Sequence, residues 1–81
     1  MITSNEALQL SLNTLDKKFK RELDLIAKYI TDSCQNGETF VYIANADELF
    51  SDLKIFALFL NKKYGYSVYV SSDGDFRVSW N

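Results

Sequence analysis

The chain has 81 residues and contains no histidine, no proline, one cysteine and three glycines. Without histidine, neither a Ser-His nor a Cys-His nucleophile can form, and the common zinc ligand sets are missing. The lone Cys34 excludes an internal disulfide, and it falls near the negative end of a predicted helix, where a thiolate is disfavoured. The sequence therefore predicts a protein that is not an enzyme, with no cofactor and no catalytic, cofactor-binding or metal-binding residues.

Long apolar runs are also missing. The longest, residues 55–60, is far shorter than the ~20 residues that a membrane-spanning helix needs. Residues 1–6 lack the basic region followed by an apolar run that marks a signal peptide. The net charge of −2 provides no general attraction to nucleic acid or to an anionic membrane. Because 47% of the residues are hydrophobic, we expect one folded domain over residues 1–81, in the cytoplasm and not bound to a membrane.

The N-terminal part, from about residue 4 to residue 35, has no helix-breaking residue and carries an apolar stripe. The stripe recurs every three or four residues: Leu8, Leu12, Leu15, Phe19, Leu23, Ile26 and Ile30. One continuous helix would be roughly 45–50 Å long, which is more than the rest of a small domain can cover. We therefore expect a long N-terminal helix whose first half projects and packs on a second copy as a homodimer. The predicted oligomerisation face consists of Leu8, Leu12, Leu15 and Phe19.

A bend in this helix is the alternative. Ser11, Asn13 and Thr14 are weak helix formers. A kink between Ser11 and Thr14, with Asn13 capping a second helix, would shorten the projecting part.

The remaining chain predicts a β-α-β-β unit and hence an α+β fold. Strands are expected at about residues 39–44, 66–71 and 75–80, with a helix at about 46–63 capped by Asn45 and Glu48. The crossover should make the first two strands parallel while the third returns antiparallel, so we expect a mixed three-stranded sheet with both helices on one face. Which strand is central is left open. An odd-length hairpin loop that sets Val70 opposite Val78 keeps the apolar residues on one face.

The uncovered face of this sheet is the first candidate binding surface. Alternation along the strands predicts that Tyr42, Tyr69 and Arg77 point away from the helices. Exposed aromatic residues on a sheet can contact a protein partner, or they can stack on nucleic-acid bases or a nucleotide. Ordinary cross-strand pairing on a solvated face explains the same residues without a ligand.

A basic cluster in the first helix is the second candidate. It consists of Lys17, Lys18, Lys20 and Arg21. It could contact nucleic acid, but a solvated helix face explains it as well. Asp16 lies four residues before Lys20, and Lys18 lies four before Glu22, so the charges have local partners.

Both ends of the chain resemble those of small bacteriophage accessory proteins. The resemblance rests on Glu6-Ala7-Leu8 near the start and on Gly65-Tyr66-Ser67-Val68 and Phe76-Arg77-Val78-Ser79-Trp80 near the end. It implies a protein expressed in the host cytoplasm to bind and block a host enzyme or defence system, and it assigns no functional residues. We therefore expect a non-enzymatic protein-interaction module with a host protein as its partner. A nucleic-acid or nucleotide binding module and a structural virion component are the alternatives.

Overall fold

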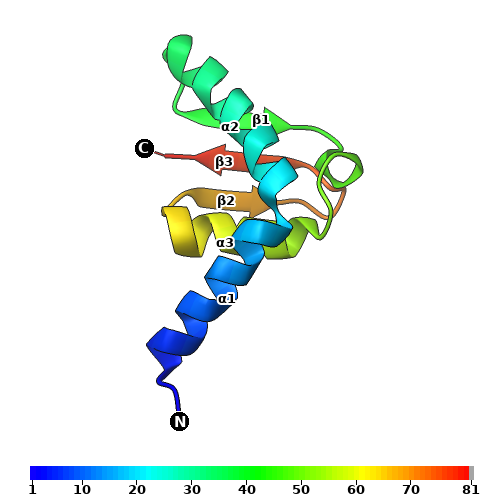
Figure 1. Ribbon diagram of the computed structural model, residues 1–81. Helices are drawn as coiled ribbons and strands as arrows, with labels where there is room; N and C mark the ends of the chain where they lie inside the picture. Colours follow the sequence, from blue (N-terminus) through cyan, green and yellow to red (C-terminus); the bar gives the residue numbers. More distant parts are fainter. Residues whose placement is uncertain (81) are drawn as a thin grey trace.

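The N-terminal helical segment has the predicted ends but consists of two helices. The computed structural model, which describes residues 1–80, has α1 at Ser4–Lys18 and α2 at Lys20–Gln35 (Figure 1). The Thr3 hydroxyl accepts a hydrogen bond from the Glu6 amide, and the Glu6 carboxylate accepts one from the Thr3 amide. This capping box fixes the start of α1. The prediction of one uninterrupted long helix is wrong, because the helix bends at Phe19.

The bend at Phe19 keeps its backbone hydrogen bonds. The Phe19 amide donates to the Leu15 carbonyl at 2.8 Å, and the Phe19 carbonyl accepts from the Leu23 amide at 2.7 Å. Its φ of −99° and ψ of 22° nevertheless depart from helical values. The alternative kink between Ser11 and Thr14 is also wrong: α1 continues through it, and the Thr14 hydroxyl donates to the Leu10 carbonyl.

The sheet is antiparallel throughout. It contains β1 (Phe40–Ile43), β2 (Ser67–Val70) and β3 (Phe76–Ser79) in the spatial order β1-β3-β2. The strands β1 and β2 run in the same direction, since each is antiparallel to β3. The predicted mixed sheet is wrong because β3 lies between them, so no two hydrogen-bonded neighbours are parallel.

The hairpin of β2 and β3 has the predicted faces in a different register. Val68 lies opposite Val78, and Val70 lies opposite Phe76. The predicted pairing of Val70 with Val78 is therefore two residues out, which leaves every side chain on its expected face. The Ser71 amide closes an odd-length loop by donating to the Asp75 carbonyl at 2.9 Å.

The helix between β1 and β2 begins later than predicted. A 3-10 helix, η1, spans Ala46–Glu48, and α3 spans Leu53–Tyr64. Asn45 is left-handed at φ 54° and makes no side-chain capping bond. The two helices are separated where the backbone of Asp52, just before α3, is left-handed at φ 47°.

The helices α2 and α3 cover one face of the sheet, and an aromatic cluster fills the space between them (Figure 1). Phe56 of α3 is its centre. The Phe56 ring centroid lies 5.0 Å from that of Phe19, 5.2 Å from that of Phe50 and 6.1 Å from that of Phe76. These four rings therefore connect the bend, the loop before α3, α3 itself and the central strand.

Replacing Phe19 tests the importance of this contact. Phe19→Ala should lower the free energy of unfolding by about 3–5 kcal/mol, because a fully buried ring is removed and the site cannot collapse completely. Urea denaturation followed by circular dichroism measures the change. The exposed Leu10→Ala is the matched control and should cost about 0.5 kcal/mol or less. Equal costs for the two variants would contradict the central position of Phe19.

Candidate functional site

Three of the residues predicted for binding form one row across the sheet. Arg77 of β3 is paired with Tyr42 of β1 on one side and with Tyr69 of β2 on the other. Directly opposed residues share a face of the sheet. Tyr42 is 58% exposed and Tyr69 is 65% exposed, on the face that no helix covers. We call Tyr42, Arg77 and Tyr69 the aromatic row.

Neighbouring side chains hold two members of the aromatic row in place. The Arg77 guanidinium lies 4.7 Å from the centroid of the Phe40 ring, a cation–π contact. The Tyr42 hydroxyl donates to Asp75 Oδ2 at 2.7 Å, and the Asn45 amide donates to Asp75 Oδ1 at 3.2 Å. Such contacts reduce the side-chain freedom that would otherwise be lost on binding. Sequence reasoning gave Asp75 no role: it placed this residue at the start of the third strand, whereas Asp75 lies one residue before β3.

The hydrogen bond between Tyr42 and Asp75 shifts the pKa of the phenol and the pKa of the carboxyl. The Tyr42 hydroxyl, followed by the Asn45 amide, holds the pKa of the Asp75 carboxyl below its usual value. The same bond raises the pKa of the Tyr42 phenol above its usual value. At neutral pH Tyr42 is therefore a neutral donor bonded to the Asp75 carboxylate. These groups suit hydrogen bonding and aromatic contact.

The surface has a shallow hollow beside Tyr69 and Arg77. Its volume is about 320 Å³, and Ser67 and Ser79 also line it. A second, apolar groove of about 390 Å³ lies on the other side of the molecule, between α2 and α3. Its lining includes Leu23, Ile30 and Leu60.

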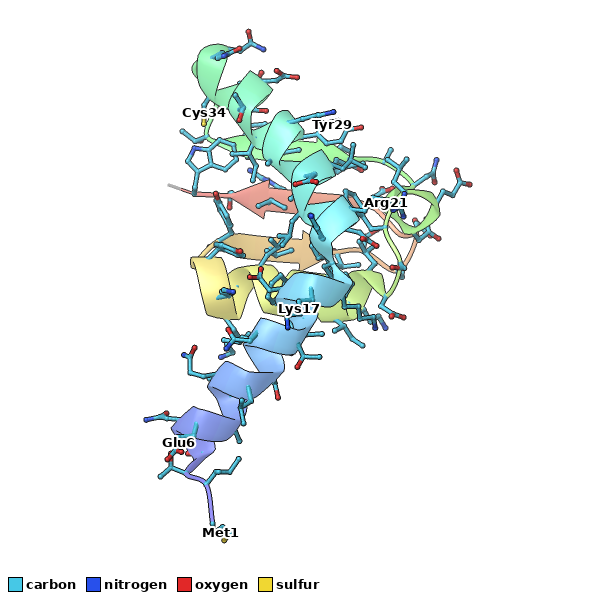
Figure 2. The ribbon with its side chains drawn as sticks, viewed as in Figure 1. Met1, Glu6, Lys17, Arg21, Tyr29 and Cys34 are labelled. Atoms are coloured by element: carbon cyan, nitrogen blue, oxygen red, sulfur yellow. The ribbon has the colours of Figure 1, made fainter. Side chains whose placement is uncertain are left out.

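The basic cluster has different partners from those predicted. Lys18 Nζ lies 2.6 Å from Asp52 Oδ2, rather than beside Glu22. Asp16 pairs with Lys63 at 2.7 Å, rather than with Lys20. The pairs that were predicted one helical turn apart are therefore wrong, because Asp52, just before α3, and Lys63, in α3, are the charges that these side chains reach. Figure 2 shows Lys17 and Arg21 on the helices, which cover the face of the sheet opposite to the aromatic row.

The predicted oligomerisation face is largely internal. Leu12 and Phe19 are buried, and Leu15 is half-buried. The prediction that they project is wrong, because the bend lets α1 pack against α3 with this stripe. Leu8 is the exception and remains 45% exposed.

Sequence reasoning also did not identify Glu22, whose carboxylate is buried. The Ser51 hydroxyl donates to Glu22 Oε2 at 2.8 Å, and Arg21 Nη2 lies 3.8 Å from it. Burial raises the pKa of Glu22, but the Ser51 hydroxyl, backbone amides and Arg21 together outweigh burial and bring the pKa below its usual value. Glu22 therefore ties the loop before α3 to the first turn of α2.

The described residues offer neither a metal site nor a membrane-spanning helix. Residues 1–80 contain no cluster of three or more His, Cys, Asp or Glu side chains that could hold a metal ion. In the same part of the chain, no helix has the length and hydrophobicity to cross a membrane. Cys34 is a free, exposed thiol.

Comparisons with protein-family models, curated proteins and solved structures gave no match. The comparisons therefore indicate no function for this chain.

The acidity of Asp75 tests the geometry of the aromatic row. In the wild type its carboxyl should titrate below 3.8, and Tyr42→Phe should raise this pKa because the phenolic donor is lost. A carboxyl with a depressed folded-state pKa stabilises the fold above its unfolded pKa and loses that contribution as the pH falls through the folded pKa. Tyr42→Phe should therefore flatten the stability profile below about pH 4.

Carbon-detected NMR titration measures the Asp75 pKa directly. The pKa of Glu22, whose partners lie elsewhere, provides the internal control and should not change. An Asp75 pKa that is the same in both proteins would show that the hydroxyl and the carboxylate are not bonded.

Proposed function

We propose that this chain is a small non-enzymatic protein-interaction module whose contact surface is the uncovered face of its sheet. The observation that carries the proposal is the aromatic row, in which two exposed tyrosines flank an arginine across three strands. Tyrosine and arginine are the residues most enriched, with tryptophan, at the energetic centres of protein interfaces. The hollow beside Tyr69 offers a place for a small partner side chain.

The charges favour a protein partner over nucleic acid. Binding to nucleic acid draws most of its affinity from several lysines or arginines that contact phosphates. The aromatic row contains one arginine, and the Asp75 carboxylate lies beside Tyr42. The basic cluster lies in the helical layer, so a strand stacked on the tyrosines would not reach it on the same face. A base stacked on Tyr42 or Tyr69 is the second candidate function, supported by their exposure.

The finer parts of the proposal concern the partner and the assembly. The resemblance of both chain ends to small phage accessory proteins favours a host protein in the bacterial cytoplasm, which this chain would bind and inhibit. The exposed Leu8, at the end of an apolar stripe, favours a homodimer.

Paired substitutions test the binding surface. The double variant Tyr69→Ala with Arg77→Ala should lose capture of the partner from a bacterial lysate, since a central interfacial residue can contribute more than about 2 kcal/mol. Its stability should change by about 0.5 kcal/mol or less per site, because both side chains are exposed. Quantitative affinity capture and thermal denaturation measure the two effects.

The matched control removes a tyrosine and a cation from α2. Tyr29→Ala with Lys28→Ala alters two exposed residues of the helical layer and should leave capture unchanged. Loss of capture in this control, with retention in the sheet variant, would move the binding surface to the helices. Nucleic acid recovered with the wild type and absent from the sheet variant would favour the second candidate function.

A further inference from the structure

The strand β2 forms an open edge of the sheet. Figure 1 shows β2 beside the central strand β3, with α3 running along it on the helical side. Its four residues, Ser67–Val70, include no charged residue and no proline, and its pairing with β3 is continuous. Natural proteins commonly protect a sheet edge with charged side chains, proline or a bulge, because an open edge pairs readily with another extended chain. The strand β2 carries none of these protections.

The backbone groups that β2 leaves free can be identified from its hydrogen bonds. The Ser71 amide donates to the Asp75 carbonyl at 2.9 Å, so these two residues form a bonded pair. Antiparallel pairs alternate between bonded and non-bonded, so Tyr69 is bonded to β3, whereas Val68 and Val70 are not. The N–H and C=O groups of Val68 and Val70 therefore point away from β3, and they make no hydrogen bond to another segment within residues 1–80. Two donors and two acceptors are available to an extended chain at this edge.

A hollow on the helical side of the sheet adjoins the edge of β2. Its volume is about 400 Å³, and it lies between the end of β2 and the start of α3. Its lining is charged at Asp52 and Lys54 and apolar at Leu53, Ile55 and Val70. A chain paired with β2 directs the side chain opposite Val70 into this side of the sheet, since directly opposed residues share a face. An apolar side chain at that position would pack against the apolar part of the hollow.

The hollow on the uncovered face adjoins the same edge. It is the hollow of about 320 Å³ beside Tyr69 and Arg77, and Ser67 and Val68 of β2 also line it. In a chain paired with β2, the residue next to the one opposite Val70 lies opposite Tyr69 and points to this face. Hydroxyl and guanidinium groups in the lining can donate to a carboxylate. An Asp or Glu side chain is therefore the group that this hollow suits.

We propose that the partner of this chain presents an extended segment, which adds to the edge of β2 as a fourth strand. The backbone of the segment bonds to the free groups of Val68 and Val70. One apolar side chain packs in the hollow beside α3, and the neighbouring Asp or Glu lies beside Tyr69 and Arg77. In strand addition of this kind, main-chain hydrogen bonds supply affinity and pockets for alternate side chains supply specificity. This inference rests on the proposed function, because it names the class of partner that reaches the aromatic row.

A second complete copy does not fit at this edge. Two copies related by a two-fold axis would pair their β2 strands antiparallel, with both α3 helices on the same face. The helix α3 contacts β2 more than any other element, so it lies over the edge strand. The two helix axes would then be about one strand spacing apart, roughly 5 Å, whereas packed helices need about 8–10 Å. The occupant is therefore an extended segment that carries no helix on this side.

Methylation of single backbone amides tests the edge. Ligation at Cys34 assembles the chain from two synthetic peptides, residues 1–33 and 34–81, so that one chosen amide can carry a methyl group. N-methylation at Val70 removes a free donor and obstructs the edge without changing a side chain. N-methylation at Phe40 is the matched control on the other edge. Its amide points outward from β1, because the Trp80 amide donates to the carbonyl of the preceding residue, Thr39, at 3.1 Å.

The probe is a segment selected from a library of short linear peptides by binding to the unmodified protein. Selected peptides should carry Asp or Glu next to an apolar residue. N-methylation at Val70 should weaken their binding by at least about tenfold, because a backbone bond is lost and the methyl group holds the segment away from the edge. N-methylation at Phe40 should leave binding unchanged. Fluorescence anisotropy measures the affinities, and circular dichroism checks the fold of both modified proteins.

Hydrogen exchange of the unmodified protein locates the segment independently. In the free protein the Val68 amide should exchange faster than the adjacent Tyr69 amide, because Tyr69 is bonded to β3. A saturating concentration of the selected peptide should slow exchange at Val68 and Val70 and leave the Phe40 amide unchanged. NMR spectroscopy in deuterated water measures each amide.

The outcomes separate strand addition from the proposed contact surface. Peptide binding that N-methylation at Val70 leaves unchanged, protection confined to other amides, or a library without binders would overturn strand addition. A wild-type dimer that N-methylation at Val70 dissociates would place a second copy at this edge instead. If the double variant Tyr69→Ala with Arg77→Ala loses partner capture from lysate while the Val70-methylated protein retains it, strand addition fails and the proposed contact surface stands. Retention of capture by both proteins would overturn both.

Discussion

The fold depends on the contacts of one ring, that of Phe56. It packs on Phe19 at the bend between α1 and α2, on Phe50 in the loop before α3, and on Phe76 in the central strand. Segments from residue 19 to residue 76 therefore meet at one point. Such rings bury a large apolar area, and their packing adds to the free energy gained from burial alone. The cluster therefore joins the bend, α3 and the central strand into one core.

This arrangement also determines which surfaces are free. Since the aromatic cluster gathers α2 and α3 on one face of three short strands, the opposite face receives no cover. Phe76 and Val78 point into the cluster, so Arg77 between them must point outward. The aromatic row is thus a direct consequence of the packing on the other side. The first part of α1 projects for a related reason, because α1 crosses α3 and extends beyond the small core (Figure 1).

Local patterns predicted much of this structure. The ends of the N-terminal helical segment follow from the capping box at Thr3 and Glu6 and from Gly37, which is left-handed just after α2. Strict alternation in β2 and β3 predicted the outward faces of Tyr69 and Arg77 before their register was known. Alternation depends on neighbouring residues alone, so an error of two residues in the register left the faces correct.

Contacts between distant residues could not be predicted in this way. Lys18 pairs with Asp52, 34 residues away, and Glu22 accepts from Ser51, 29 residues away. Both contacts replaced the pairing of Lys18 with Glu22, four residues apart, that helix geometry predicted. The central position of β3 and the bend at Phe19 likewise depend on packing against α3. No signal within the N-terminal segment itself marks Phe19 as the place where the helix must turn.

The central claim is that the uncovered sheet face is the surface that binds a partner. NMR spectra of the protein with isotope-labelled tyrosine rings, recorded as purified partner is added, test it most directly. The account predicts that the ring signals of Tyr42 and Tyr69 shift or broaden, while those of Tyr29 on α2 and Tyr64 on α3 stay unchanged. Changes confined to Tyr29 and Tyr64, with the signals of Tyr42 and Tyr69 unaltered, would contradict the claim.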